Sequence, residues 1–333
     1  MMPTSLSGRL AMFNVMQVAR QLKSAVLADP ERFYTNETGA WVTGLPTPQE
    51  IRVSTGREPF WINLGYWRDV ERVDETNCER VGELFMAAQA QMAHLLARTA
   101  RLGERDSVLD CGFGYADQDI LWAETYRPAR IVGVNVTPKQ VDIGRERLRL
   151  TGLDGVVKLE LGSATQLPFG AGEFDVVFAL ESAMHFRTRG DFLREAFRVL
   201  RPGGRLVMAD MCQKTDRESG AGLRRRLRHR YWRGRIAFPE ANVWTTQRYV
   251  SELRHAGFQL ARLDSIASDV YPAVNTALAA LRGMTAAERQ PGSVTVAKVR
   301  EDVRRARQME FEQLQWLTLF NCDEYAVVYA EKP

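Results

Sequence analysis

Short apolar runs alternate with amphipathic segments over most of the chain. The apolar runs have the length typical of buried strands, and the segments between them repeat apolar residues at helical spacing. Strands are predicted at 108–111, 130–136, 156–161, 174–180, 205–210, 258–266 and 325–331. Strands that alternate with helices favour a parallel, doubly wound α/β sheet, in which ligands bind beyond the carboxyl ends of the strands.

A helix is predicted directly before the first strand. The residues from Thr76 to Glu79 form a capping-box pattern, in which the first and last side chains satisfy free backbone N–H groups at a helix start. Apolar residues then repeat at helical spacing as far as Gly103, which we expect to end the helix.

Three further helical segments lie outside the strand–helix alternation. At 10–27, apolar residues recur at helical spacing and predict an amphipathic helix. We favour packing of this helix on the core or on a partner subunit over a role at a membrane surface. If it packs on a partner subunit, the protein is a homo-oligomer. Two helices at 273–288 and 295–319 stand between the last two strands and look like an insertion.

These elements divide the chain into two parts. Residues 1–75 form an N-terminal helix and an aromatic loop, for which we expect the role of a lid or cap. Residues 76–333 form one α/β domain with a helical insertion at about 267–321. No internal repeat or linker divides the sequence further.

Composition narrows the class of protein. Of the 333 residues 45% are hydrophobic, and 45 Lys+Arg against 41 Asp+Glu do not favour a nucleic-acid partner. The four cysteines lie far apart without Cys-x-x-Cys spacing, and we expect reduced thiols in a cytoplasmic protein. Polar residues interrupt the apolar N-terminal stretch, so neither a signal peptide nor a membrane span is predicted.

The stretch at 108–120 carries the clearest chemical signal. An apolar strand runs into Gly112 and Gly114 and then into a helix-compatible segment, an arrangement that turns backbone N–H groups towards a bound cofactor. A dinucleotide fingerprint needs a third glycine where Asp117 stands, and Asp117 is too bulky there and wrongly charged beside a pyrophosphate. Asp110 instead suits a cationic ligand such as S-adenosylmethionine (SAM). A purely structural tight turn is the alternative at this point.

More motifs follow the glycine loop in order. They lie at 133–137, at 162–169 with 173–177, and at 200–204, and with the loop they resemble those of the class I SAM-dependent methyltransferases. The resemblance covers about 63–210 and implies a Rossmann-like seven-stranded sheet with SAM as the cofactor. The residues that it places at the cofactor are Asp110, Gly112, Gly114, Asn135, Val136, Gln140, Ser163, Ala164 and Leu180.

Two of these positions depart from the family pattern. Most members end the second strand with an acid that accepts both ribose hydroxyls, whereas Asn135 can accept only through its carbonyl oxygen. Many members also have an acid where Ser163 stands. Ser163 can still accept a hydrogen bond from the adenine amino group, and Ala164 can donate its backbone N–H to the ring.

Within this family the chain is similar to bacterial natural-product O-methyltransferases of the erythromycin sugar and microcystin polyketide type. The shared residues lie at 62–67, in the glycine loop, at 162–165 and at 180–185. The similarity implies an enzyme of secondary metabolism that O-methylates a hydroxyl of a polyketide, a macrolide or its sugar. A small-molecule natural product is therefore the expected substrate.

The loop after the fourth strand holds the candidate catalytic residues. His185 should project from the carboxyl edge of the sheet, and imidazole, with a reference pKa near 6.5, suits a general base at neutral pH. Glu181 could orient His185, bind an acceptor hydroxyl or cap the following turn. No metal site is predicted, because Glu181, His185 and Asp210 lack a recognisable ligand spacing.

The aromatic and basic segments do not decide which molecule accepts the methyl group. Trp61, Tyr66, Trp67 and Trp232 are candidates for the substrate site, or anchors in the core. The arginines at 224–235 form a solvated helix face or an anion-binding flap. The alternative function is C-methylation of a prenyl diphosphate, with these arginines on the diphosphate and Glu181 at a carbocation. A protein that binds SAM without methylating is the third hypothesis.

Overall fold

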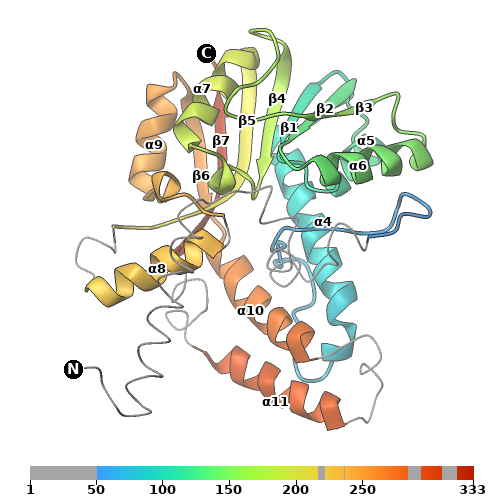
Figure 1. The fold of residues 1–333 in the computed structure, drawn as a ribbon, viewed down its shortest axis with the longest axis vertical. Helices are drawn as coiled ribbons and strands as arrows, with labels where there is room; N and C mark the ends of the chain where they lie inside the picture. The colour runs from blue at the N-terminus through green and yellow to red at the C-terminus, as the bar shows by residue number, and fades with distance from the viewer. Residues whose placement is uncertain (1–50, 217–221, 236, 284–293, 310–320) are drawn as a thin grey trace, which may run out of the picture.

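The computed structural model describes residues 51–216, 222–235, 237–283, 294–309 and 321–333, so the predicted helix at 10–27 lies outside the described residues. Within these ranges seven strands form one sheet in the order β3-β2-β1-β4-β5-β7-β6. The strands are β1 (Ser107–Cys111), β2 (Arg130–Asn135), β3 (Val157–Leu161), β4 (Phe174–Leu180), β5 (Leu200–Cys212), β6 (Gln259–Ser265) and β7 (Glu324–Glu331). The predicted doubly wound, seven-stranded α/β fold is confirmed (Figure 1).

The last strand departs from the parallel arrangement. β7 pairs with β5 and with β6 in the antiparallel sense, and Met211 of β5 lies opposite Tyr325 of β7. The beginning of β7 therefore lies at the carboxyl edge of the other strands. A parallel sheet would have placed the end of β7 there, so this reversal changes which residues reach the ligand edge.

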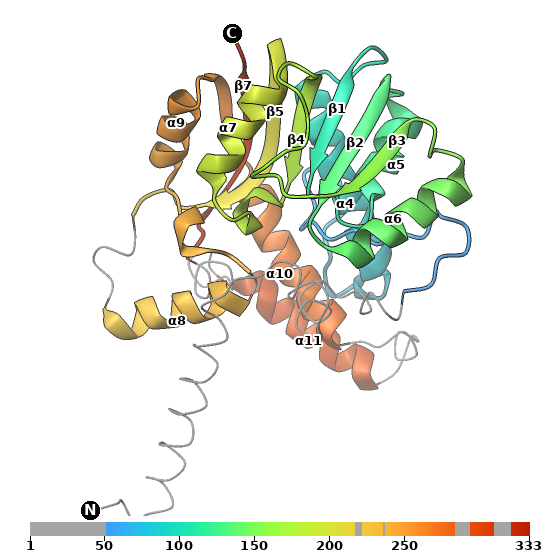
Figure 2. The same ribbon diagram turned by 45° about the horizontal axis from the view of Figure 1, so that its top comes forward.

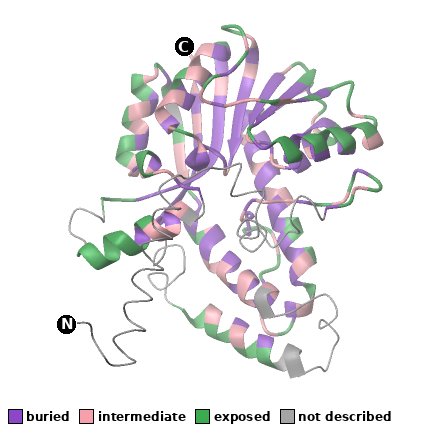
Figure 3. Ribbon diagram, in the orientation of Figure 1, coloured by how far each residue is buried: buried purple, intermediate pink, exposed green. Residues whose placement is uncertain are grey.

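Each face of the sheet is covered by its own helices. Val108 of β1 and Val176 of β4 face a core cluster that includes buried side chains of α4 (Val81–Ala100), α5 (Asp117–Thr125), α6 (Pro138–Thr151) and α10 (Ala267–Gly283). The neighbouring residues Leu109 and Val177 face the second cluster, with α7 (Arg189–Val199) and α9 (Thr246–His255). Strand residues alternate between the faces, so a sheet covered on both sides reads as a continuous apolar run. Figure 3 shows the strands buried between these layers.

The capping-box prediction at Thr76 was wrong. Thr76 lies before a short 3-10 helix, Cys78–Arg80, which leads into α4, and its hydroxyl contacts the Asp74 carboxylate 2.6 Å away instead of a helix N–H. α4 also ends before Gly103, because Arg101 takes the left-handed conformation with φ 52° and its N–H bonds to the last turn. A left-handed residue ends a helix whether or not it is glycine, although glycine adopts it at lower cost.

Two helices lie between β6 and β7 in the chain, as the sequence predicted. α10 begins at Ala267, earlier than predicted, and α11 (Val294–Gln308) packs against it below the sheet (Figure 2). The basic run forms α8 (Leu223–Arg235), which projects from the body in both views.

None of the described helices combines the length and the apolar character that a membrane crossing requires.

Candidate active site

The glycine loop lies against the loop that follows β4. Gly112 has φ +89°, and a Cβ atom built on it would lie only 2.4 Å from Cβ of Ser182. The Ser182 hydroxyl donates a hydrogen bond to the Cys111 carbonyl, 2.5 Å away, and Gly112 donates its N–H to Val134 at 2.8 Å. Only glycine satisfies both the conformation and the close approach. The two loops therefore share the carboxyl edge of the sheet.

Two buried carboxylates lie at this edge. Oδ2 of Asp110 accepts a hydrogen bond from Gln118 at 2.9 Å, whereas Oδ1 of Asp110 and both oxygens of Asp119 have no hydrogen-bond partner among the described residues. Burial raises the pKa of both carboxyls, and Asp110 raises that of Asp119 further. Unpaired buried carboxylates are stabilised by a cation, so the site fits the ammonium and sulfonium groups of SAM.

The end of β2 holds a second set of polar groups. The side-chain Nδ2 of Asn135 donates to Oε1 of Gln140 at 2.9 Å, and the side-chain Oδ1 of Asn135 accepts from the Thr137 N–H at 3.2 Å. The carbonyl that the sequence assigned to the ribose is thus already shared. Nε2 of Gln140 is buried and makes no hydrogen bond of good geometry within the described ranges, although the Tyr115 hydroxyl is close enough for the Gln140 amide to lower the pKa of Tyr115; Nε2 is therefore available as a donor for a ribose oxygen. Val136, beside them, is 37% exposed.

The loop after β3 completes the cofactor edge. The Gly162 N–H donates to the backbone carbonyl of Asn135 at 3.0 Å, which places Ser163 and Ala164 next to the end of β2. The Ser163 hydroxyl lies 2.9 Å from that of Thr165, and Ala164 is buried. Leu180 ends β4 and is also buried. Apart from Gln140, which lies in the first turn of α6, the predicted cofactor residues therefore come from the ends of four parallel strands that are neighbours in the sheet.

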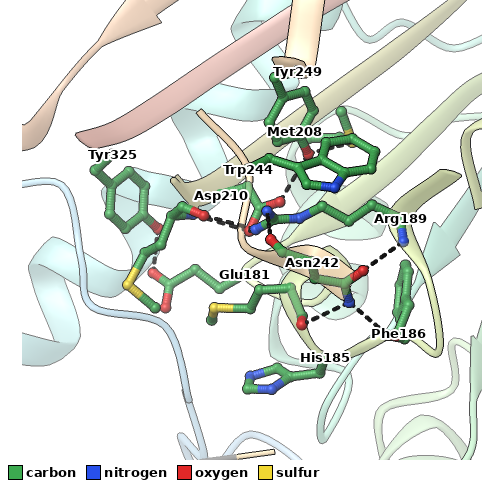
Figure 4. A network of polar contacts seen from close by, with 12 residues as sticks. Glu181, His185, Phe186, Arg189, Met208, Asp210, Asn242, Trp244, Tyr249 and Tyr325 are labelled. Carbon is green, nitrogen blue, oxygen red and sulfur yellow. Dashed lines mark hydrogen bonds and ion pairs between the residues drawn. The ribbon is translucent and has the colours of Figure 1, made fainter. Parts of the chain in front are cut away.

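Glu181 follows β4 in a left-handed conformation, with φ +47°. Its carboxylate accepts a hydrogen bond from the Leu64 N–H at 2.7 Å. The Tyr325 hydroxyl donates a second hydrogen bond to it (Figure 4). Burial raises the pKa of Glu181 to about 7, so protonated and ionised forms coexist near neutral pH. A carboxyl group in that state can either donate or accept a proton.

His185 ends a short 3-10 helix, Ala183–His185, and is 7% exposed. Its Nδ1 lies 2.9 Å from the carbonyl oxygen of Ala237. A carbonyl only accepts, so the neutral ring carries its proton on Nδ1, and Nε2 keeps its lone pair. The contact that fixes this tautomer therefore comes from a backbone carbonyl.

The aromatic candidates lie in different surroundings. Trp67 is fully buried, stacks on Phe85 with ring centroids 5.7 Å apart and donates its indole N–H to the Leu64 carbonyl at 3.1 Å. Tyr66 is buried as well, whereas Trp61 and Trp232 are partly buried against the same core. The structure thus places Trp67 inside the core, and Trp61 and Trp232 retain accessible surface.

The arginines of α8 are divided between two environments. Arg224, Arg225 and Arg226 are exposed, whereas Arg233 is 1% exposed and forms an ion pair with Glu240 at 3.1 Å. Within the described ranges, no three His, Cys, Asp or Glu side chains are grouped so that they could hold a metal ion.

Replacing Glu181 with Gln should change how stability depends on pH. Native Glu181 keeps its proton up to about pH 7, whereas the unfolded side chain loses it near 4.5. The native state therefore binds more protons between these values, and the free energy of unfolding falls as the pH rises through this window. The rise in pKa corresponds to about 3 kcal/mol.

Gln keeps an acceptor oxygen and cannot ionise. Urea unfolding should therefore show Glu181→Gln more stable than the wild type at about pH 8.5, by up to about 3 kcal/mol, and similar to it at about pH 4. An equal difference at both pH values would show that Glu181 does not titrate in this range.

Several residues of the site were missed by the sequence analysis. Tyr325 contacts Glu181, and Asn242 and Arg189 lie behind the His185 loop. Tyr325 lies at the start of its strand, and in a fully parallel sheet the start of a strand lies at the edge opposite the ligand. The sequence analysis therefore did not place Tyr325 in the site. Neither Asn242 nor Arg189 belongs to a motif with a recognisable spacing.

Comparisons with known proteins agree with this geometry. A family described as a methyltransferase domain matches residues 109–208. Erythromycin 3''-O-methyltransferase of Saccharopolyspora erythraea is 39% identical over 64% of this chain, and the alignment spans 66% of that relative, just under two thirds of its length. The 27-O-demethylrifamycin SV methyltransferase of Amycolatopsis mediterranei is 30% identical over 72% of this chain and 84% of its own length.

A solved structure has the same fold. Geranyl diphosphate C-methyltransferase from Streptomyces coelicolor A3(2) superposes with a TM-score of 0.62 at 16% identity, over 92% of this chain and 97% of that one. Such low identity establishes the fold alone. Together with the two relatives, the glycine loop and the buried carboxylates beside it, the fold identifies the chain as a member of the class I SAM-dependent methyltransferases, with SAM as its cofactor.

Proposed function

We propose that the protein O-methylates a hydroxyl group of a polyketide, a macrolide or an attached sugar, with His185 as the general base. The observation that carries the proposal is the hydrogen bond from His185 Nδ1 to the Ala237 carbonyl, which leaves the basic nitrogen of the neutral ring at Nε2. The names of the two relatives, which methylate oxygens of erythromycin and rifamycin compounds, support this class of acceptor.

Each group at the sheet edge has a role in this reaction. SAM supplies an electrophilic methyl group, so the protein has to bind the two reactants and accept one proton. Asp110 and Asp119 would balance the positive charge of the cofactor, Gln140 would hold its ribose, and Ser163 and Ala164 its adenine. His185 would take the hydroxyl proton on Nε2. Glu181, which can donate or accept near neutral pH, would hydrogen-bond the acceptor oxygen.

The N-terminal part is proposed to act as a lid over this edge. Its described residues already contact the site, because the Leu64 N–H binds Glu181 and the Phe60 N–H donates to Asp117 at 3.0 Å. Trp61 lies between these two anchors and is the aromatic side chain that we assign to the acceptor, with Trp232 of α8 as a second contact.

C-methylation of a prenyl diphosphate is the competing function. Two observations favour it, namely the buried Glu181 carboxylate at the end of β4 and the exposed Arg224, Arg225 and Arg226, which could bind a diphosphate.

Product analysis distinguishes the two reactions. The protein is supplied with SAM carrying a ¹³C-methyl group and with either a panel of hydroxylated macrolides and their glycosides or geranyl diphosphate. We expect the label in a methoxy group, seen by ¹³C NMR, and no effect of replacing Arg224, Arg225 and Arg226 together with Ala. Label bonded to carbon in a prenyl product, lost in the triple variant, would contradict the proposal.

A further inference from the structure

A buried polar network lies behind the loop that carries Glu181 and His185 (Figure 4). Arg189, the first residue of α7, is fully buried, and its guanidinium lies 2.9 Å from Oδ1 of Asp210. The Tyr249 hydroxyl donates to Oδ2 of the same carboxylate at 2.8 Å. The Arg189 backbone N–H donates to Oδ1 of Asn242 at 2.8 Å. A buried guanidinium needs such partners, so the network is a fixed support.

Asn242 connects this support to the backbone on both sides of His185. Its Nδ2 donates one hydrogen bond to the Met184 carbonyl at 3.0 Å and a second to the Phe186 carbonyl at 2.6 Å. The neighbours fix the orientation of the amide, because two carbonyls face its nitrogen and one N–H group faces its oxygen. Asn242 itself is fully buried.

The same short segment also holds the imidazole ring. Ala237, whose carbonyl accepts from His185 Nδ1, lies five residues before Asn242 in the connection between α8 and α9. The Arg189 guanidinium anchors this connection to α7 through the Asn242 backbone carbonyl, and the Trp244 indole N–H forms a hydrogen bond within the connection, to the Ala241 carbonyl at 2.8 Å. Three hydrogen bonds therefore run from residues 237–242 to residues 184–186.

We propose that Asn242 is a positioning residue for methyl transfer, which holds the His185 backbone so that the ring meets both the Ala237 carbonyl and the acceptor hydroxyl. The inference rests on the proposed role of His185. Its physical basis is that a displacement of about 1 Å in a catalytic group can cost about 10²-fold in rate. Without the two amide donors, the Met184 and Phe186 carbonyls lose their link to the Arg189 support.

The sharpest variant is Asn242→Asp. The carboxylate keeps the acceptor for the Arg189 N–H, and its charge lies near the Arg189 guanidinium, but it cannot donate to the two carbonyls. We expect kcat to fall by about 10- to 100-fold, while the dissociation constant of SAM changes by less than about 2-fold. In a His185→Ala background the same substitution should change kcat by less than about 3-fold, because no ring is left to position.

Asn77→Ala is the matched control. Asn77 is also buried and clamps backbone through both ends of its amide, to the Arg72 carbonyl at 3.2 Å and the Asp74 N–H at 2.8 Å, but it lies before α4. It should lower the melting temperature and leave kcat unchanged. Asn242→Ala provides a second, uncharged test of the lost donors.

Each other outcome overturns the inference in a recognisable way. A variant of Asn242 that lowers only the melting temperature would make the residue purely structural. An equal fall in kcat with and without His185 would mean that Asn242 acts through another group, and failure of both Asn242 variants to fold would mean that it serves the whole fold. If His185→Ala alone leaves kcat unchanged, the proposed base is wrong and the inference fails with it.

Discussion

His185→Ala should lower kcat by about 10²- to 10⁴-fold, which is the contribution typical of a positioned general base. The acceptor hydroxyl is a poor nucleophile until its proton is removed, and the substitution removes the nitrogen that we assign to this step. SAM binding should be nearly unaffected, because the residues assigned to the cofactor lie at the ends of β1, β2, β3 and β4. The hydrogen bond of His185 runs instead to the α8–α9 connection.

Two measurements make this result specific. Single-turnover rates with saturating SAM separate the chemical step from product release, and calorimetric titration measures the affinity for SAM. His255→Ala, on the exposed end of α9, is the control and should match the wild type in both. A His185 variant that turns over at the wild-type rate would remove His185 from the role of base and leave Glu181 as the candidate.

The sequence could predict that the residues assigned to the cofactor gather at one edge of the sheet, because these residues are local to motifs. Gly112 follows a buried strand, needs a left-handed backbone and has no room for a side chain, so the motif and the geometry have the same cause. Asn135, Ser163 and Leu180 lie at or just after strand ends in the same way. Parallel neighbouring strands bring these positions together without any long-range information.

The acceptor half depends on contacts between distant parts of the chain. Tyr325 reaches Glu181 because β7 is antiparallel, and Leu64 reaches it across 117 residues. Ala237 and Asn242 contact the His185 loop from segments more than 50 residues away. The local spacing of apolar residues does not predict contacts between such distant segments. For the same reason, the sequence could not decide whether Trp67 lines a binding site or fills the core.

Asp117 shows how a residue can be interpreted correctly for one question and incompletely for another. It excluded a dinucleotide fingerprint, and in the structure it begins α5 and is buried in an ion pair with Arg147 at 3.0 Å. Burial raises the pKa of Asp117, although Arg147 opposes the rise. Arg147 also donates to the carbonyls of Gly56 at 3.1 Å and Glu58 at 2.7 Å, so the pair fastens the N-terminal segment to the glycine loop.

Asp117→Ala should destabilise the protein by about 3–5 kcal/mol, because it leaves the buried Arg147 guanidinium without its counter-ion. Chemical unfolding at neutral pH measures this loss. The control is Glu146→Ala on the same helix as Arg147, which breaks the exposed Arg149–Glu146 pair and should cost less than about 1 kcal/mol.

The double variant Asp117→Ala with Arg147→Met tests whether the unpaired charge of Arg147 causes the loss of stability in Asp117→Ala. If an uncompensated charge is responsible, the second substitution should recover much of the lost stability, since apolar replacement of a buried pair is often neutral or stabilising. A double variant no more stable than Asp117→Ala would instead show that the hydrogen bonds of Arg147 to residues 56 and 58, which only the double variant loses, contribute as much as the relief of the buried charge. In that case Arg147→Met alone should be as damaging as the double variant, which places the structural weight on the hydrogen bonds rather than on the charge.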